Sequence, residues 1–160
     1  LIQKLAAESG FDENYIKEAG EYTPGGFLAS AFTNRSFGPT NEDLLWKLQY
    51  RIIRELAEKE PCVIVGRCAD YILKDYENVV NIFIRANLDF RIKRSIQVDQ
   101  LDESKAGEIV SKKDKSRGNY YRYHAGERWD NLMNYDLVLR SDLVGIDKAV
   151  ECIKNYVEAM

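Results

Sequence analysis

Apolar positions recur at helical spacing in two parts of the chain that precede Pro61. Within residues 1–20 they lie on either side of Ser9-Gly10, which predicts two short helices joined by a turn. A longer helix is predicted from Asn41 to the residue before Pro61, because apolar residues recur there every third or fourth position while charged residues lie mainly elsewhere. The apolar positions of this helix are Leu45, Leu48, Ile52 and Leu56. Residues 21–40 are rich in Gly, Ser, Thr and Asn and predict a flexible insertion.

After Pro61, short apolar runs alternate with segments of helical period. The runs predict strands at Cys62–Val65, Val79–Ile84 and Tyr135–Leu139. Helices are predicted from Ala69 to Leu73, Leu88 to Val98, Leu101 to Lys115 and Ile146 to Val157. Strands that alternate with helices indicate an α/β fold with a parallel sheet flanked by helices. The length of 160 residues predicts a single domain over residues 1–160.

Charge and hydropathy narrow the classes of partner. The chain has 23 basic and 26 acidic residues and a net charge of −3, so its overall field repels a nucleic-acid polymer. Any anion site must therefore be local. The apolar runs are far shorter than the roughly 20 residues that span a bilayer, so no membrane segment is expected.

Cysteine and histidine usage excludes several kinds of chemistry. The three cysteines contain no CxxC pair, so neither a disulfide framework nor a zinc site is indicated. This usage predicts a reducing, cytoplasmic location. His124 is the sole histidine, which leaves no multi-histidine metal site, and we interpret it as a packed or surface residue.

The residues that directly follow each predicted strand are the first candidates for a binding site, because ligands of parallel sheets bind beyond the carboxyl ends of the strands. These exits are Gly66 to Asp70, Arg85 to Asn87, and Arg140 to Asp142. An arginine at a strand end offers a planar fork for phosphate or carboxylate. The alternative for Arg67 is an ion pair with Asp70 or a solvated position in a loop.

Basic residues also gather between Lys105 and Arg128, where the sequence has seven basic and three acidic residues. This segment is either a local anion site or a solvated helix end whose positive side chains interact favourably with the helix dipole. Its interleaved tyrosines raise the further possibility of a single-stranded nucleic-acid surface, which the overall charge disfavours. A smaller group of four residues could contact phosphate or form a solvated basic face: Arg85, Arg91, Lys93 and Arg94.

Three segments carry a resemblance to a known family. Residues Cys62–Leu73, Lys113–Tyr123 and Asn134–Leu139 resemble the cytidylate kinase-like family, relatives of the P-loop nucleoside monophosphate kinases. The resemblance implies a three-layer P-loop fold with a helical lid at residues 113–130. It also implies transfer of the γ-phosphoryl group of ATP to CMP or dCMP with Mg²⁺.

The same resemblance implies roles for individual residues. Substrate binding is expected at Gly66, Arg67, Asp70 and Asp114, although the family's Gly-Arg-Asp motif has its aspartate displaced here to Asp70. The transferring phosphoryl group is expected to meet Lys113, Arg117 and Arg122. ATP, which the resemblance implies, is expected to contact Arg85, Arg91 and Arg94 because of their position at and after a predicted strand end. The insertion at residues 21–40 would belong to the acceptor-binding region.

The ATP-phosphate loop of the family is not found in this sequence. The 160 residues contain no GxxxxGK[ST] pattern, and Pro24-Gly25-Gly26 follows no predicted strand. Family members begin with a strand and a glycine-rich loop ahead of the segment that Leu1 to Lys4 resembles. Either those elements have been lost upstream of Leu1, or the protein lacks the ATP site. The second alternative predicts a non-catalytic nucleotide-binding or regulatory relative.

Overall fold

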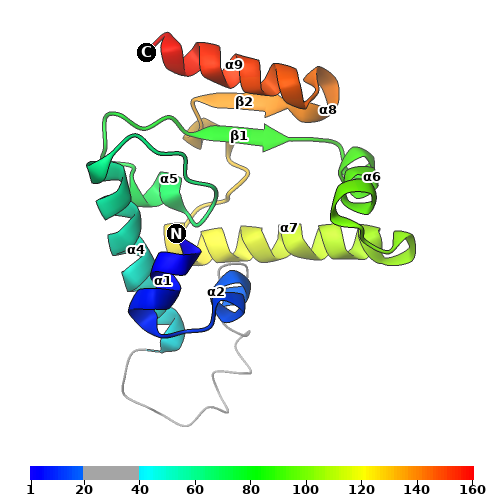
Figure 1. Ribbon diagram of the computed structural model, residues 1–160. Coiled ribbons are helices and arrows are strands. Elements are labelled where there is room, and N and C mark those ends of the chain that lie inside the picture. Colours follow the sequence, from blue (N-terminus) through cyan, green and yellow to red (C-terminus); the bar gives the residue numbers. More distant parts are fainter. Residues whose placement is uncertain (20–39) are drawn as a thin grey trace. The chain divides into compact units, whose positions relative to one another are not determined.

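The computed structural model describes residues 1–19 and 40–160, a mostly helical α/β chain with a small parallel sheet (Figure 1). The helices of the described residues are α1 (Ile2–Ser9), α2 (Glu13–Ala19), α4 (Asn41–Lys59), α5 (Ala69–Ile72), α6 (Leu88–Asp99), α7 (Glu103–Ala125), the 3-10 helix η1 (Leu132–Asn134), α8 (Ser141–Val144) and α9 (Ile146–Glu158). The strands are β1 (Ile82–Arg85) and β2 (Leu137–Arg140). The insertion predicted for residues 21–40 lies, up to residue 39, outside the described residues.

Contacts divide the chain into two compact units. The first unit holds residues 1–76 and 116–127, and the second holds residues 77–115 and 128–160. Helix α7 contributes residues to both units. The single domain expected from the chain length stays a prediction.

Local sequence signals begin and end the helices of the first unit. Helix α1 ends at Gly10, whose φ of +72° lets its N–H donate to the carbonyl of Ala6. Helix α4 begins at a reciprocal capping box, in which the Thr40 hydroxyl accepts from the Asp43 N–H and the Asp43 carboxylate accepts from the Thr40 N–H. The cap of this helix is therefore Thr40, and the helix begins at Asn41 as predicted.

The core of the first unit forms where α1, α2 and α4 meet (Figure 1). Its buried members are Leu5, Ile16, Leu45 and Ile52. They come from the apolar stripes that the sequence pattern places on these helices, so the amphipathic faces pack against one another. The predicted pair of short helices within residues 1–20 is confirmed.

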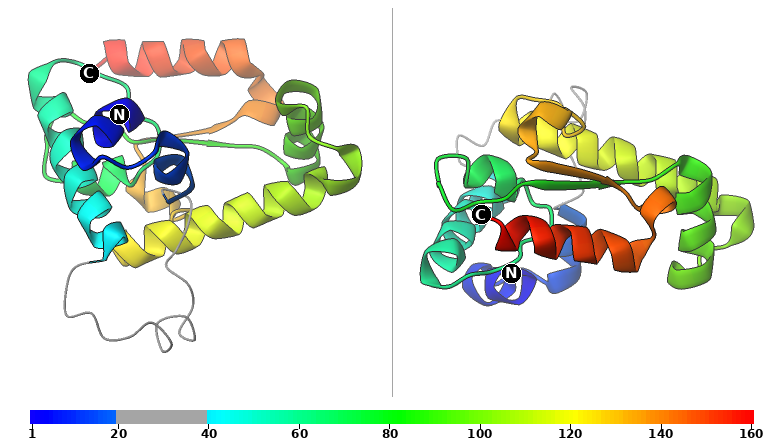
Figure 2. Two further views of the ribbon diagram at one scale, coloured as in Figure 1. Left: turned by 60° about the horizontal axis from the view of Figure 1, so that its bottom comes forward. Right: turned by 90° about the horizontal axis from the view of Figure 1, so that it is seen from above.

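The second unit is built around the parallel pair of β1 and β2. Ile82 is in register with Leu137 and Arg85 with Arg140, so both strands end at the same edge of the sheet. Helix α9 packs along β2 (Figure 2). The Phe83 ring lies 4.8 Å from that of Tyr135 and 5.6 Å from that of Trp129, between ring centroids. Apolar and aromatic packing therefore fixes β1 and β2, whose carboxyl ends carry the candidate residues Arg85 and Arg140.

The prediction of a buried strand at Cys62–Val65 is wrong. This segment has no regular secondary structure, and Val63 and Val65 are 94% and 87% exposed. A strand needs a neighbour to satisfy its backbone groups, and within the described residues the sheet consists of β1 and β2 alone. The apolar run shows β-propensity but does not supply that partner. The other two strands are confirmed, shifted by up to three residues.

Helix α7 continues ten residues beyond its predicted end at Lys115, through residue 125. The sequence of residues 116–134 looks too polar and aromatic for a helix, and Gly118 lowers helix propensity. Tyr120 and Tyr121 are each only 8% exposed, so aromatic burial in the first unit stabilises the extra turns. No helix in residues 1–19 and 40–160 is long and apolar enough to cross a bilayer.

Candidate active site

The segment that carries the family-like Gly-Arg pair is a strained turn. Gly66, Arg67 and Cys68 are successive residues with φ of +68°, +58° and +53°. Glycine adopts this left-handed conformation freely, but each of the two side-chain-bearing residues costs roughly 1–2 kcal/mol. We call this segment the Gly66–Cys68 turn. Such strain persists only where surrounding contacts hold the backbone in place.

A buried amide from α4 holds this turn. The side chain of Gln49 is 1% exposed, and its Nε2 donates to the backbone carbonyl of Arg67 and to the hydroxyl of Tyr120, both at 3.1 Å. Because a carbonyl can only accept, the amide nitrogen and not the oxygen must face Arg67. Burial raises the pKa of Tyr120 to about 12, so its hydroxyl stays protonated. No sequence pattern singled out Gln49, since a lone glutamine on a helix gives no signal.

The Arg67 guanidinium reaches the end of α2. Its Nη1 donates to the carbonyl of Ile16 at 3.1 Å and its Nη2 to the carbonyl of Lys17 at 3.5 Å. Cations near the last carbonyls of a helix are favourable. Among the described residues no Arg67–Asp70 ion pair forms, and Asp70 instead accepts from the Tyr121 hydroxyl at 2.7 Å. Arg67 therefore retains its charge while two of its donors contact neutral acceptors.

Cys68 is a packed thiol and not a nucleophile. Its side chain is 4% exposed. Burial, reinforced by the Asp70 carboxylate and opposed by Arg67, raises the pKa of the Cys68 thiol to about 12. At neutral pH the thiolate is negligible, so this residue contributes packing to the turn.

The basic residues of the predicted lid lie on one continuous helix. Lys113 and Asp114 are inside α7. At roughly 100° per residue, Lys113 and Arg117 share a face, whereas Arg122 projects from the side opposite Lys113. All three cations are exposed. The helix therefore brings Lys113 and Arg117 together but not Arg122.

Arg91 and Asp114, expected to contact ATP and the acceptor respectively, form an ion pair with each other. Arg91 Nη1 lies 2.6 Å from Asp114 Oδ2, and the two side chains are 34% and 27% exposed. A Cβ atom added at Gly107 of α7 would lie 3.5 Å from Ile92 Cδ1 of α6, so the two helices approach closely at this glycine. Arg85 and Arg94 are exposed. Arg91 is thus engaged within the second unit.

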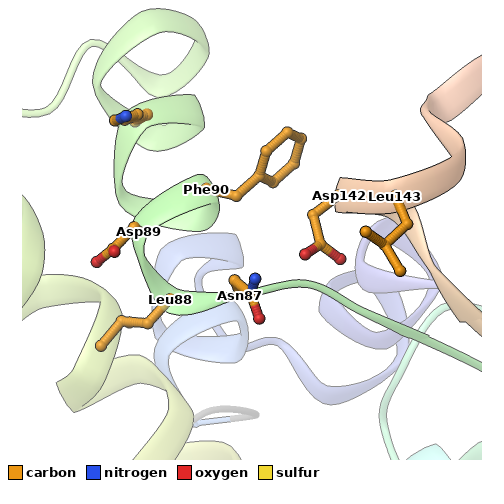
Figure 3. Close-up of a pocket in the computed structure, with 7 residues that line it drawn as sticks. Asn87, Leu88, Asp89, Phe90, Asp142 and Leu143 are labelled. Atoms are coloured by element: carbon orange, nitrogen blue, oxygen red, sulfur yellow. The ribbon is translucent and has the colours of Figure 1, made fainter.

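A hollow of about 570 Å³ opens at the carboxyl ends of β1 and β2 (Figure 3). It is lined by Asn87, Leu88, Asp89, Phe90, Lys93, Asp142 and Leu143. Figure 3 shows side chains from the start of α6 facing those of α8, with the Phe90 ring directed toward α8. The expectation that ligands bind beyond the strand ends identified Asn87 and Asp142. It missed the apolar lining residues Leu88 and Phe90 of α6 and Leu143 of α8.

An arginine fork stiffens one wall of this hollow. Arg140 donates from Nε to Asp142 Oδ1 at 3.2 Å and from Nη2 to Asp142 Oδ2 at 2.6 Å, and also from Nη2 to the Asn87 side chain at 3.1 Å. The hydrogen bond from Arg140 is the main reason that the pKa of Asp142 is lowered, and an Asn87 backbone donor adds to it. Arg140 is therefore already neutralised by a carboxylate.

The aromatic part of α7 is mostly core. The His124 ring stacks on Trp46 with centroids 3.8 Å apart and an angle of 12°, and Tyr120 lies 4.5 Å away. Burial lowers the pKa of His124 to about 4, against a small opposing effect of the Asp43 carboxylate. Of the tyrosines in this segment only Tyr123 is well exposed, at 58%. The segment does not offer a row of free rings for stacking bases.

Comparison with known proteins identifies the class. A model of the cytidylate kinase-like family matches residues 1–143, and the chain belongs to this family. A cytidylate kinase from Methanoculleus marisnigri is 30% identical over 152 residues, which cover 92% of this chain and 80% of that protein. A cytidylate kinase from Sulfurisphaera tokodaii is 22% identical over 114 residues, which cover 71% and 63%. The resemblance carried by the Gly66–Cys68 turn and the later segments is thereby confirmed.

A solved structure shares the fold. The crystal structure of an uncharacterized protein from Eubacterium ventriosum superimposes with a TM-score of 0.71 and 28% sequence identity. The similarity covers 99% of this chain and 89% of that one. The arrangement of helices around a small parallel sheet is therefore not peculiar to this sequence.

Proposed function

We propose that the chain acts as a nucleoside monophosphate kinase, transferring the γ-phosphoryl group of ATP to CMP or dCMP. The observation that carries this proposal is the Gly66–Cys68 turn, a strained segment that presents an arginine in a chain of the cytidylate kinase-like family. Strain of this kind gathers where a ligand must be held. The proposal includes a three-layer P-loop-type fold for the domain. It also includes a cytoplasmic location, in keeping with three free thiols.

In this proposal Arg67 binds the acceptor phosphate. A guanidinium has more N–H donors than the two that contact the carbonyls of Ile16 and Lys17. A phosphate also competes well for donors held by neutral carbonyls, because hydrogen bonds to an ionised acceptor are roughly twice as strong. Gly66 and Asp70 flank this contact, and Asp70 is held by Tyr121.

The transferring phosphoryl group meets the cations of α7. Phosphoryl transfer needs positioning and neutralisation of oxygen charge, which exposed lysine and arginine side chains supply. Lys113 and Arg117 act from one helix face, so they can contact one phosphoryl group together. Arg122, on another face, requires a rearrangement of the 113–130 segment to join them.

The strand-end hollow suits the base of a nucleotide better than its phosphates. Its size falls within the range of roughly 300–1,000 Å³ that ligand sites show. Phe90, Leu88 and Leu143 offer apolar contact and Asn87 a neutral polar group. Asp142 is already paired with Arg140, and Lys93 and Asp89 offset one another in charge, so the lining has no surplus of cations for phosphates. We assign the hollow to the ATP base.

ATP phosphates would be contacted by Arg85 and Arg94. Arg91 and Asp114 instead act as a structural pair, in place of the separate contacts expected from the resemblance. This assignment leaves Arg85 and Arg94 as the exposed arginines of the group.

Mg²⁺, when bound with ATP, supplies charge neutralisation on the phosphate oxygens. In residues 1–19 and 40–160 no group of three or more His, Cys, Asp or Glu side chains could hold a metal ion. The ion would therefore be carried chiefly by the nucleotide and water. The acceptor phosphate is already an anion at neutral pH, so the chain's own residues bind and orient without needing a general base.

A nucleotide-binding relative without turnover is the second candidate. It is favoured by the engagement of two expected site arginines, Arg67 by the α2 carbonyls and Arg91 by Asp114. Such a protein would bind a monophosphate through the same turn but would not align it for transfer.

Calorimetry with CMP, dCMP, UMP and AMP, paired with an ADP-release assay containing ATP and Mg²⁺, tests the proposal on the full-length protein. Turnover with CMP or dCMP supports the kinase. Binding without ADP release supports the second candidate, and neither binding nor turnover contradicts both. Arg51→Ala serves as a control, because Arg51 is an exposed arginine of the first unit that pairs with Glu8.

A further inference from the structure

We propose that Gln49 is a positioning residue, which holds the Gly66–Cys68 turn in its left-handed conformation and so directs Arg67 toward the acceptor phosphate. The inference rests on the proposed role of Arg67 in acceptor binding. Gln49 itself is buried and would not touch the nucleotide.

The side-chain amide of Gln49 makes two hydrogen bonds, to two different partners. Both hydrogens of its NH₂ group are used, one on the Arg67 carbonyl and one on the Tyr120 hydroxyl. The first bond acts on the backbone of the strained residue. The second ends at the Tyr120 hydroxyl of α7 and does not act on the backbone of the turn.

The turn has few other restraints on its backbone. The Ala69 N–H donates to the Gly66 carbonyl at 3.1 Å and the Ile72 N–H to the Cys68 carbonyl at 2.9 Å. These bonds close the start of α5, but neither contacts the Arg67 carbonyl. Without the Gln49 donor, the peptide between Arg67 and Cys68 can rotate, which changes ψ of Arg67 and lets φ of Cys68 leave its left-handed value, so the turn that presents Arg67 can shift.

Cys68 provides a local reporter that does not depend on activity. Its thiol is buried inside the turn, whereas Cys62 and Cys152 are exposed. With Cys62 and Cys152 replaced by serine, thiol labelling measures opening of the turn. We expect Gln49→Met, which keeps the side-chain volume and removes both donors, to speed Cys68 labelling roughly tenfold or more, the order of one lost hydrogen bond.

Kinetics of the full-length protein supply the functional arm. Gln49→Met should raise the KM for the monophosphate roughly tenfold while leaving the KM for ATP within about twofold, because only the acceptor arginine moves. Tyr120→Phe is the matched control: it removes the other bond of Gln49 and keeps the bond to Arg67, so both KM values and the labelling rate should change less than about twofold. If Gln49→Met does not fold, Gln49→Asn, too short to reach the carbonyl, replaces it.

The decisive comparison uses the Arg67→Ala background. If Gln49 acts through Arg67, the double variant should have the same monophosphate KM as Arg67→Ala alone. An equal, additive loss in that background, equal effects of Tyr120→Phe and Gln49→Met, or unchanged Cys68 labelling would each overturn the inference. Failure of the wild type to bind or turn over any monophosphate overturns the proposed function instead, and the labelling arm then still decides whether Gln49 holds the turn.

Discussion

The Gly66–Cys68 turn and the strand-end hollow both present an arginine, but the acceptors of the two arginines differ. Arg67 donates to the neutral carbonyls of Ile16 and Lys17, whereas Arg140 lies across the carboxylate of Asp142. A carbonyl does not neutralise a guanidinium, whereas a carboxylate does. The difference teaches which of these two arginines we expect to bind a phosphate, namely Arg67.

The largest effect should come from removing the uncompensated arginine. Arg67→Ala is expected to weaken CMP binding by about 1.5–3 kcal/mol, because a charge-assisted contact is lost. Calorimetry measures the change, and circular dichroism checks that the fold is kept. The CMP affinity of Arg67→Lys should lie between those of the wild type and Arg67→Ala, since lysine keeps the charge but not the planar fork.

The control for this comparison is an exposed arginine of the first unit, outside the turn. Arg51→Ala should leave CMP affinity unchanged, since Arg51 pairs with Glu8 and Glu55 on the surface. An equal loss of affinity in both variants would mean that net charge, and not the turn, attracts the nucleotide.

A neutralised arginine should matter for stability instead of binding. Asp114→Ala is expected to lower the free energy of unfolding by about 1.5 kcal/mol, because it strands the partly buried Arg91 cation. Urea unfolding measures this, and CMP affinity should change less than about twofold. Arg94→Ala, an exposed arginine one turn from Arg91, should leave stability within about 0.5 kcal/mol. A large loss of CMP affinity in Asp114→Ala would restore the direct substrate contact expected from the resemblance.

A smaller effect should reveal the backbone strain itself. Arg67→Gly and Arg67→Ala lose the same guanidinium, but glycine tolerates the φ of +58° and alanine does not. The glycine variant should therefore be more stable than the alanine variant by about 1 kcal/mol in urea unfolding. Equal stabilities, or a more stable alanine variant, would show that the turn relaxes once the arginine side chain is gone.

Much of the fold could be read from periodicity, whereas the site could be read only in part. Helical stripes placed α4, α6 and α9 within a residue or two, because the period of apolar positions is a local signal of a helix. The strand predicted at 62–65 failed because pairing depends on a neighbour that local sequence does not encode. For the same reason spacing identified Arg67 but not Gln49, and it could not reveal that Arg91 meets Asp114, twenty-three residues away.

The subtlest contrast concerns His124, which lies in the first unit and is the only histidine. Burial lowers its pKa to about 4, from the ordinary 6.5 that it has in the unfolded chain. Between these values the unfolded state binds a proton that the folded state refuses, so stability falls as the pH drops from 6.5 toward 4 and is unaffected above 6.5. Carboxylates titrate mostly below pH 5, so the upper part of this window reports on His124 alone.

His124→Phe, which can still stack on Trp46, should flatten the slope of the melting temperature between pH 6.5 and 5.5, where the wild type should lose about 3 °C. Parallel slopes in the two proteins would place the imidazole in contact with water, and the aromatic segment of α7 would then be open to ligands after all.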